Sequence, residues 1–213
     1  MSSQPAVDGA AQVSRVQRKR GRRIQEILTT AAELFGERGY DAVSLEDVAE
    51  RLDVTKGSLY YYFASKDELA VAAIETLGAT WTARLERLVA TQEGPVGGRL
   101  RALIREHVAI AVGEYPAALR LFLVPSTWPD DPRARIKELR RRHDRVFRGL
   151  VEEGVASGEF AVTSVGTTLQ CMHATMAQAP LWCADQDTRE RDKCLDQLAD
   201  TLMKLVAPAA ADL

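Results

Sequence analysis

The chain has 213 residues and 46% of them are hydrophobic, which is enough for a small domain and a larger one, each with its own core. Its formal net charge at pH 7 is only −2, no apolar run approaches the roughly 18 residues of a membrane-spanning helix, and no apolar leader follows the first residues. These features argue against membrane insertion and export, and they predict a cytoplasmic protein.

The N-terminal residues are polar at first and then strongly basic. Residues 1–14 are rich in Ser, Ala, Gln and Gly, while residues 12–24 hold six basic residues and no acid. This composition predicts a disordered basic arm over residues 1–21. The arm could follow DNA phosphates or enter a narrow minor groove, or it could be a solvated tail; both interpretations remain open.

A first helix is expected from about Arg22 to Arg38, ended by Gly39. Apolar residues recur along it at helical spacing, so this face should pack beneath the elements that follow. The predicted core residues of this helix are Ile24, Ile27, Leu28, Ala31, Leu34 and Phe35.

Two short helices joined by a sharp turn are predicted between Ser44 and Phe63. Ser44 is a good N-cap, and Asp47 three residues later can complete a variant of the capping box. Asp53 tolerates the left-handed backbone that the turn needs, and Thr55 caps the second helix. This arrangement is typical of a helix-turn-helix that binds DNA.

The second helix turns its polar and aromatic residues partly outward. Its Lys can donate to guanine or phosphate, its Gly permits close approach, and Tyr rings can contact thymine methyl groups. Part of the aromatic run instead belongs to the core, namely Leu59, Phe63 and one face of Tyr62, and the rotation of the helix leaves each single tyrosine unassigned. The predicted DNA-binding residues of the whole segment are Ser44, Thr55, Lys56, Gly57, Ser58, Tyr60, Tyr61, Tyr62 and Lys66.

Residues 23–69 resemble the N-terminal domain of the tetracycline-repressor (TetR) family of bacterial regulators. The resemblance rests on AAELFGERGY from Ala31, SLEDVA from Ser44, KGSLYYYF from Lys56 and SKDEL from Ser65. Asp53 departs from the Gly that many members carry, at little cost if the left-handed turn is kept. The resemblance implies an all-α protein with a three-helix helix-turn-helix domain, over residues 22–67, and a helical ligand-binding and dimerisation domain, over residues 68–213.

Beyond Ser65 the apolar pattern predicts further helices separated by Gly and Pro breaks. They are a long helix to about Leu88 and, after a break at 93–98, a helix that carries Leu100 to Ala111 and is closed by Tyr115 and Pro116. Further helices are expected at 117–124, 133–157, 164–183 and 188–206, with a loop at 126–132. The run KELRRRHDR in the fourth of these helices is interpreted as a solvated face, because acids alternate with its bases at helical spacing.

The last two helices each carry an apolar side and are expected to need a partner. The resemblance implies that they pair with their copies in a homodimer, which would place two recognition helices about 34 Å apart on a palindrome.

The three cysteines, Cys171, Cys183 and Cys194, lack metal-site spacing, and small buried hydrophobes are the expected role, with a thiol sensor as the alternative. No metal, cofactor or catalytic cluster is predicted, so an enzyme is not expected.

The resemblance also implies an inducer pocket among the middle helices, for an apolar or aromatic ligand with one or two polar groups. The default interpretation of each candidate taken singly is an ordinary core residue. The candidates are Trp81, His107, Phe122, Trp128, Phe147, Met172, His173, Met176 and Trp182.

The sequence therefore predicts a dimeric repressor that binds a palindromic operator in double-stranded DNA and is released by a small-molecule effector, with no membrane partner. Three alternatives remain: a transcriptional activator, a ligand-independent DNA-binding protein, and an enzyme that carries a DNA-binding domain.

Overall fold

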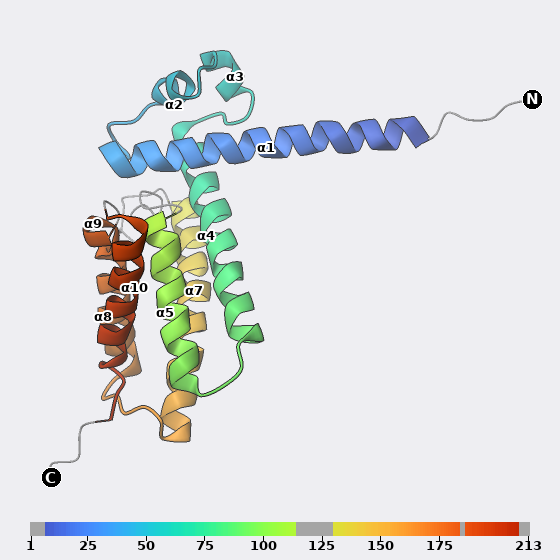
Figure 1. Ribbon diagram of the computed structural model, residues 1–213. Helices are drawn as coiled ribbons and strands as arrows, with labels where there is room; N and C mark the ends of the chain where they lie inside the picture. Colours follow the sequence, from blue (N-terminus) through green and yellow to red (C-terminus); the bar gives the residue numbers. More distant parts are fainter. Residues whose placement is uncertain (1–6, 114–129, 184–185, 209–213) are drawn as a thin grey trace, which may run out of the picture. The chain divides into compact units, whose positions relative to one another are not determined.

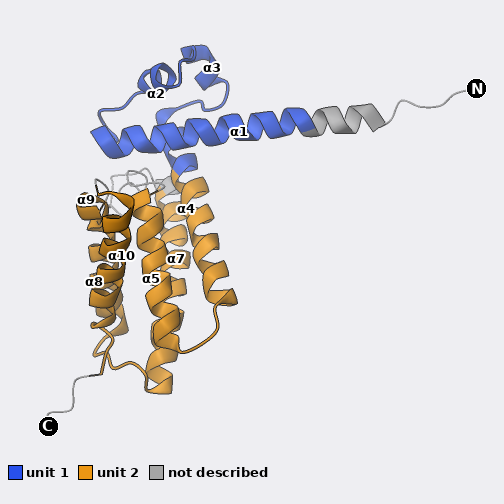
Figure 2. Ribbon diagram, viewed as in Figure 1, with its two compact units in different colours: residues 1–73 blue, residues 74–213 orange. Residues whose placement is uncertain are grey.

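The computed structural model describes residues 7–113, 130–183 and 186–208, and every regular element within these ranges is a helix (Figure 1). The predicted all-α fold class is confirmed. The chain divides into two compact units, residues 1–73 and residues 74–213 (Figure 2).

Unit 1 begins with a single long helix, α1 (Val7–Arg38). The expected disordered arm over residues 1–21 is corrected here, because the helix begins at Val7 instead of near Arg22. Ala, Gln, Lys and Arg dominate residues 10–23 and are good helix formers, and no proline interrupts them. Gly39 ends the helix with φ of 84°, as predicted, and donates its amide to the Phe35 carbonyl oxygen at 3.0 Å.

The helix-turn-helix consists of α2 (Leu45–Arg51) and α3 (Lys56–Tyr60). The Asp47 amide donates to Ser44 Oγ at 3.2 Å and the Ser44 amide donates to the Asp47 carboxylate at 2.7 Å, which confirms the predicted capping box. Asp53 adopts φ of 52°, as the turn requires. Helix α3 is shorter than predicted, because the Tyr62 and Phe63 amides both donate to the Leu59 carbonyl oxygen and close a turn there.

Helix α4 (Lys66–Thr91) contributes its first residues to unit 1 and the rest to unit 2. The Glu68 amide donates to Ser65 Oγ at 3.1 Å, so Ser65 caps the helix. The Glu68 carboxylate accepts from the Ala64 amide at 2.8 Å, one residue before the partner that a capping box uses.

Within the described residues, unit 2 contains the rest of α4 together with five further helices. They are α5 (Val96–Gly113), α7 (Asp130–Ser157), α8 (Val165–Gln178), α9 (Pro180–Cys183) and α10 (Thr188–Met203). Helix α5 packs against α7, α8 and α10, and it supplies the fully buried Leu100, Leu103 and Ile104 (Figure 1). Burial of this apolar surface is the main source of the unit's stability.

Ion pairs join the helices of unit 2 outside the core. Arg142 on α7 binds the Glu86 carboxylate on α4 through two hydrogen bonds of 2.8 and 2.5 Å. Arg101 and Arg105 on α5 bind three successive acidic turns of α10 at 2.6 to 3.1 Å, namely Asp192, Asp196 and Asp200. Two-point guanidinium contacts of this kind fix the relative rotation of neighbouring helices.

The region predicted as one helix over 164–183 is two helices. Pro180 lacks an amide hydrogen, so α8 ends before it and α9 starts with proline as its first residue. The apolar sides of α8 and α10 are largely covered within the chain, because Leu169, Met172, Leu195 and Leu202 are all buried. These stripes therefore pack inside unit 2, whereas the sequence analysis expected them to need a second subunit.

Two of the cysteines are paired, which corrects their expected role as simple buried hydrophobes. Cys183 on α9 and Cys194 on α10 form a disulfide, with their Cα atoms 6.1 Å apart. Cys171 on α8 is a free, exposed cysteine. Helices α9 and α10 pack against each other, which brings together two cysteines that lie 11 residues apart.

Some predictions lie outside the described residues, namely the helix at 117–124, most of the loop at 126–132, and the candidates Phe122 and Trp128. Helix α7 starts at Asp130, slightly before the predicted Arg133. Among the described helices, none is long and apolar enough to cross a membrane.

Candidate nucleic-acid interface

Helix α3 buries one residue and exposes most of the others. Leu59 is buried against the rest of unit 1, whereas Tyr60 is 43% exposed and Tyr61 is 72% exposed. Large aromatic side chains of that exposure are unusual on a surface that contacts only water. The outward tyrosines are therefore Tyr60 and Tyr61, while Tyr62 is half-buried and packs edge-on against Tyr61.

Lys56 at the start of α3 is exposed, and its ammonium group contacts the Glu46 carboxylate on α2. The same group lies 5.5 Å from the centre of the Tyr60 ring. The hydrogen bond with Glu46 raises the pKa of Lys56 and lowers the pKa of Glu46. Lys56 is thus held at the surface beside Tyr60. Its ammonium group must leave the Glu46 carboxylate in order to bind a phosphate or a guanine.

Two shallow depressions flank α3. One, of about 550 Å³, is lined by α3, the preceding turn and α1 through Arg23, Val54, Thr55, Gly57, Ser58, Tyr61 and Tyr62. The other, of about 440 Å³, has Ser44, Tyr60 and Lys66 among its lining residues. Apart from Lys56, which stands on the exposed side of α3, every predicted DNA-binding residue lines one of these depressions.

Three of the predicted contacts already have structural roles. Ser44 caps α2, and the Thr55 hydroxyl accepts from the Ser58 amide at 3.2 Å to cap α3. The Lys66 ammonium group donates to the Tyr40 carbonyl oxygen at 3.1 Å. These side chains shape the surface, and their direct contact with DNA remains a prediction.

Two arginines of α1 join this surface and were not among the predicted contacts. The Arg20 guanidinium lies 6.0 Å from the centre of the Tyr61 ring, and Arg23 lines the larger depression. Both arginines belong to the basic run of residues 12–24, which the sequence analysis interpreted as part of a disordered arm. As part of a helix, the same residues are held at fixed positions beside α3.

In unit 2 the predicted effector residues are mostly buried. Trp81, His107, Phe147, Met172 and Met176 are at most 4% exposed. His173 is half-buried, whereas Trp182 is 50% exposed on α9 and lies outside the buried set. Burial alone fits an ordinary core as well as a ligand site, so the pocket itself remains a prediction.

All three histidines of the chain meet inside unit 2, each from a different helix. The rings of His107 on α5 and His143 on α7 are 5.0 Å apart, and the His173 ring on α8 lies 5.5 Å from His143. Phe147 packs edge-on against both His107 and His173. We call these four residues the histidine cluster.

Burial lowers the pKa of each histidine in the cluster, that of His143 to about 3. The imidazoles are therefore neutral at pH 7. His107 Nδ1 and His173 Nε2 are buried and make no hydrogen bond to any residue that the structure describes. No group of three or more His, Cys, Asp or Glu side chains in the described ranges is arranged to hold a metal ion.

His143 was missed by the sequence analysis, which assigned its surroundings to a solvated face. The signal was available, because Ile136, His143, Phe147 and Leu150 repeat at helical spacing on one side of α7 and are all buried. The charged residues on either side of His143 concealed this pattern.

Comparison with known proteins identifies both parts of the chain. Residues 27–73 match the family described as "Bacterial regulatory proteins, tetR family", and residues 93–206 match "Tetracyclin repressor-like, C-terminal domain". The chain therefore belongs to the TetR family. It is a transcriptional regulator with an N-terminal DNA-binding helix-turn-helix and a helical C-terminal domain.

Among curated proteins, the chain is 23% identical over 134 residues to the fatty acid metabolism regulator protein of Bacillus subtilis, covering 63% of this chain and 69% of that one. It is 32% identical over 137 residues to the A-factor receptor protein of Streptomyces griseus, covering 61% of this chain and 49% of the relative.

Solved structures share the fold. FadR from Bacillus subtilis in complex with stearoyl-CoA has a TM-score of 0.67 at 19% identity, covering 85% of this chain and 98% of that one. AibR in complex with isovaleryl coenzyme A and operator DNA has a TM-score of 0.70 at 23% identity, covering 87% of this chain and 98% of that one.

Proposed function

We propose that the protein is a dimeric repressor that binds a palindromic operator through α3 and leaves it when a small molecule binds unit 2. The observation that carries this proposal is the exposed face of α3, where Lys56, Tyr60 and Tyr61 stand between two depressions. A lysine and aromatic rings on the second helix of a helix-turn-helix suit the major groove.

Exposed apolar residues support a dimer. Leu181 and Trp182 on α9 are 60% and 50% exposed, and Leu205 after α10 is 42% exposed. Leu181 and Trp182 are adjacent and form one exposed apolar patch, of the kind that marks interaction sites, whereas Leu205 follows the far end of α10. We place the dimer contact at the last helices, and a dimer would let two copies of α3 read successive major grooves.

The release step follows from differential affinity. An effector that binds the DNA-incompetent state more tightly shifts the population toward it, whereas equal affinity for both states would shift nothing. Helix α4 is the proposed carrier of this signal, because it begins beside the helix-turn-helix at Lys66 and is tied to α7 through the Glu86–Arg142 pair. Since FadR and AibR were solved with acyl-CoA molecules, apolar acyl compounds are the first effectors to test.

The test uses DNA from both sides of the gene that encodes the protein, because regulators of this kind often control neighbouring genes. Footprinting should show one protected palindrome, and a reporter fused to that site should be more active when the regulator is deleted. Lower reporter activity after deletion would identify an activator instead. Protection that no compound relieves would favour a ligand-independent DNA-binding protein.

A further inference from the structure

The N-terminal half of α1 carries positive charge that the rest of unit 1 does not neutralise. Residues 15–26 hold six cations and a single carboxylate, that of Glu26, so this stretch has a net charge of +5. Glu26 pairs with Arg23 at 2.6 Å. The other five cations are exposed and form no ion pair with any residue that the structure describes, namely Arg15, Arg18, Lys19, Arg20 and Arg22.

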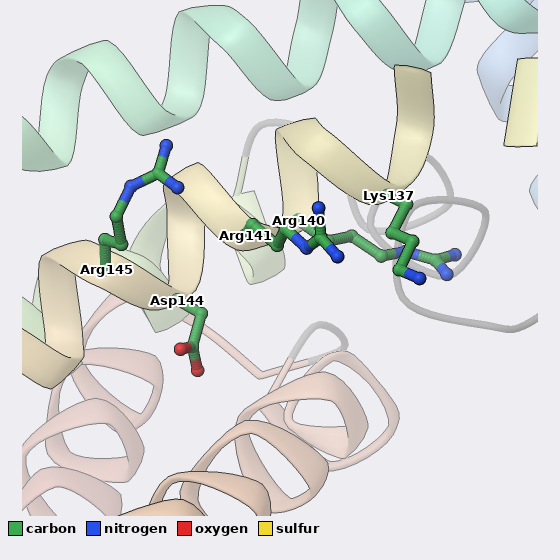
Figure 3. Close-up of a pocket in the computed structure, with 5 residues that line it drawn as sticks. All are labelled: Lys137, Arg140, Arg141, Asp144 and Arg145. Atoms are coloured by element: carbon green, nitrogen blue, oxygen red, sulfur yellow. The ribbon is translucent and has the colours of Figure 1, made fainter. Parts of the chain in front are cut away.

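The basic run of α7 has the opposite character. Glu138 binds both Arg141 at 3.6 Å and Arg145 at 3.1 Å, and Asp144 binds Arg148 at 2.9 Å. Figure 3 shows the Asp144 carboxylate on the same stretch of helix as Arg141 and Arg145. Acids of α7 itself therefore pair with several of its cations, whereas α1 offers a row of cations without partners to an outside anion.

Two cations of α1 lie beside the exposed tyrosines of α3. The Arg20 guanidinium is 6.0 Å from the centre of the Tyr61 ring, and Arg23 lines the larger depression next to α3, which no acidic residue lines. Lys19 directly precedes Arg20 and stands one turn before Arg23, so it lies on the same half of the helix. We call Lys19, Arg20 and Arg23 the α1 basic face. It is continuous with the candidate DNA-binding surface of α3.

Helix geometry separates this face from the other cations. Successive residues of an α-helix are rotated by about 100°, so Arg20 lies only about 20° around α1 from the buried Ile27. On the same reckoning, Arg18 and Arg22 lie about 180° and 140° from Ile27 and point away from α3. One helix thus presents two sides with similar charge, and only one of them adjoins the tyrosines.

The helical conformation gives these cations fixed positions. Helix α1 continues past α2 and α3 toward its N-terminus (Figure 1). The eight residues from Arg15 to Arg23 rise by about 12 Å, which is the length of about three to four base pairs. A preformed helix also avoids the ordering cost that a disordered arm meets on binding. Cations on this helix can therefore reach DNA beyond the groove that α3 would occupy.

We propose that the α1 basic face is a second DNA contact, which binds the phosphates that flank the major groove occupied by α3. This inference rests on the proposed function and adds a contact that carries no sequence information. Phosphate contacts position a protein on the duplex and supply affinity, while the base contacts of α3 select the operator.

Anisotropy titrations at several salt concentrations test this contact, with the footprinted operator and with a scrambled duplex of the same length. Lys19→Gln/Arg20→Gln should weaken binding to both duplexes by the same factor, at least about tenfold at low salt, because phosphates are common to both. The slope of log affinity against log salt should fall by about 2 per protomer, since each lost phosphate contact removes about 0.9. Glutamine is a good helix former, so the circular dichroism spectrum should not change.

Arg18→Gln/Arg22→Gln is the matched control, because it removes two charges from the other side of the same helix. It should change the slope by about half as much or less, through the general field of the protein. Equal losses in the two double variants, or unchanged slopes in both, would overturn the proposal. A wild type that binds both duplexes equally, with the same difference between the variants, would support the α1 contact while contradicting operator recognition by α3.

Discussion

The ammonium group of Lys66 donates a hydrogen bond to the backbone carbonyl oxygen of Tyr40, 3.1 Å away, and lies 4.4 Å from the centre of the Tyr40 ring. This contact joins the first residue of α4 to the segment that follows α1. It fixes the start of α4 within unit 1, at the position where the proposed ligand signal from unit 2 would enter the DNA-binding domain.

Replacing Lys66 with Met should lower the free energy of unfolding by about 1 kcal/mol, because a half-exposed hydrogen bond and a cation–π contact are lost together. Urea unfolding followed by circular dichroism measures the change. Lys204→Met is the control, since Lys204 is exposed after α10. Equal stability of the two variants would show that the contact adds nothing.

Glu46 should act against DNA binding. Its carboxylate contacts Lys56, so that ammonium group must exchange a protein partner for a DNA partner when the complex forms. Glu46→Gln should therefore raise operator affinity by up to about fivefold, because an exposed ion pair is weak and a negative charge leaves the interface. Anisotropy titration measures the gain, and the same substitution in a Lys56→Ala background should give a smaller one.

The histidine cluster should make unit 2 sensitive to acid. Because the folded-state pKa of His143 is lowered to about 3 from an ordinary 6.5, the unfolded chain binds a proton that the folded chain does not. The contribution of neutral His143 to the free energy of unfolding is complete above pH 6.5 and is lost as the pH drops toward 3. At pH 5 the loss from this one group is about 2 kcal/mol.

His143→Gln should remove that part of the pH dependence. Urea unfolding of the wild type and the variant at pH 7.5 and pH 5 isolates the effect, since the carboxylates titrate in both proteins. Parallel losses of stability in the two proteins would mean that His143 is not the group responsible.

The Cys183–Cys194 disulfide should stabilise unit 2. The bond closes a loop across a separation of 11 residues, and the chain-entropy estimate for a loop of that size is about 3 kcal/mol. Dithiothreitol should lower the melting temperature of the wild type and of Cys171→Ser, which retains the bond. The double variant Cys183→Ser/Cys194→Ser should melt at the reduced protein's temperature whether or not the reductant is present.

The helix-turn-helix could be predicted from the sequence because its determinants are local. Ser44, Asp47 and Thr55 cap helices within three residues of themselves, and Asp53 adopts the left-handed backbone that its own side chain tolerates. The prediction of a disordered basic arm was wrong, because residues 10–23 are rich in strong helix formers as well as charge and continue α1.

The candidate site in unit 2 could be predicted only in part. His107 and His173 were recognised singly, but their meeting with His143 depends on how α5, α7 and α8 pack, which no local pattern encodes. The disulfide has the same origin, since Cys183 and Cys194 meet only through the packing of α9 against α10.

The central claim is that the exposed face of α3 reads DNA, and operator affinity in Lys56→Ala and Tyr60→Ala tests it most directly. Fluorescence anisotropy with the footprinted operator should show each variant roughly five- to a hundredfold weaker than the wild type, with an unchanged circular dichroism spectrum. Lys193→Ala on α10 should bind like the wild type. Unchanged operator affinity in both α3 variants would contradict the assignment of this face to DNA.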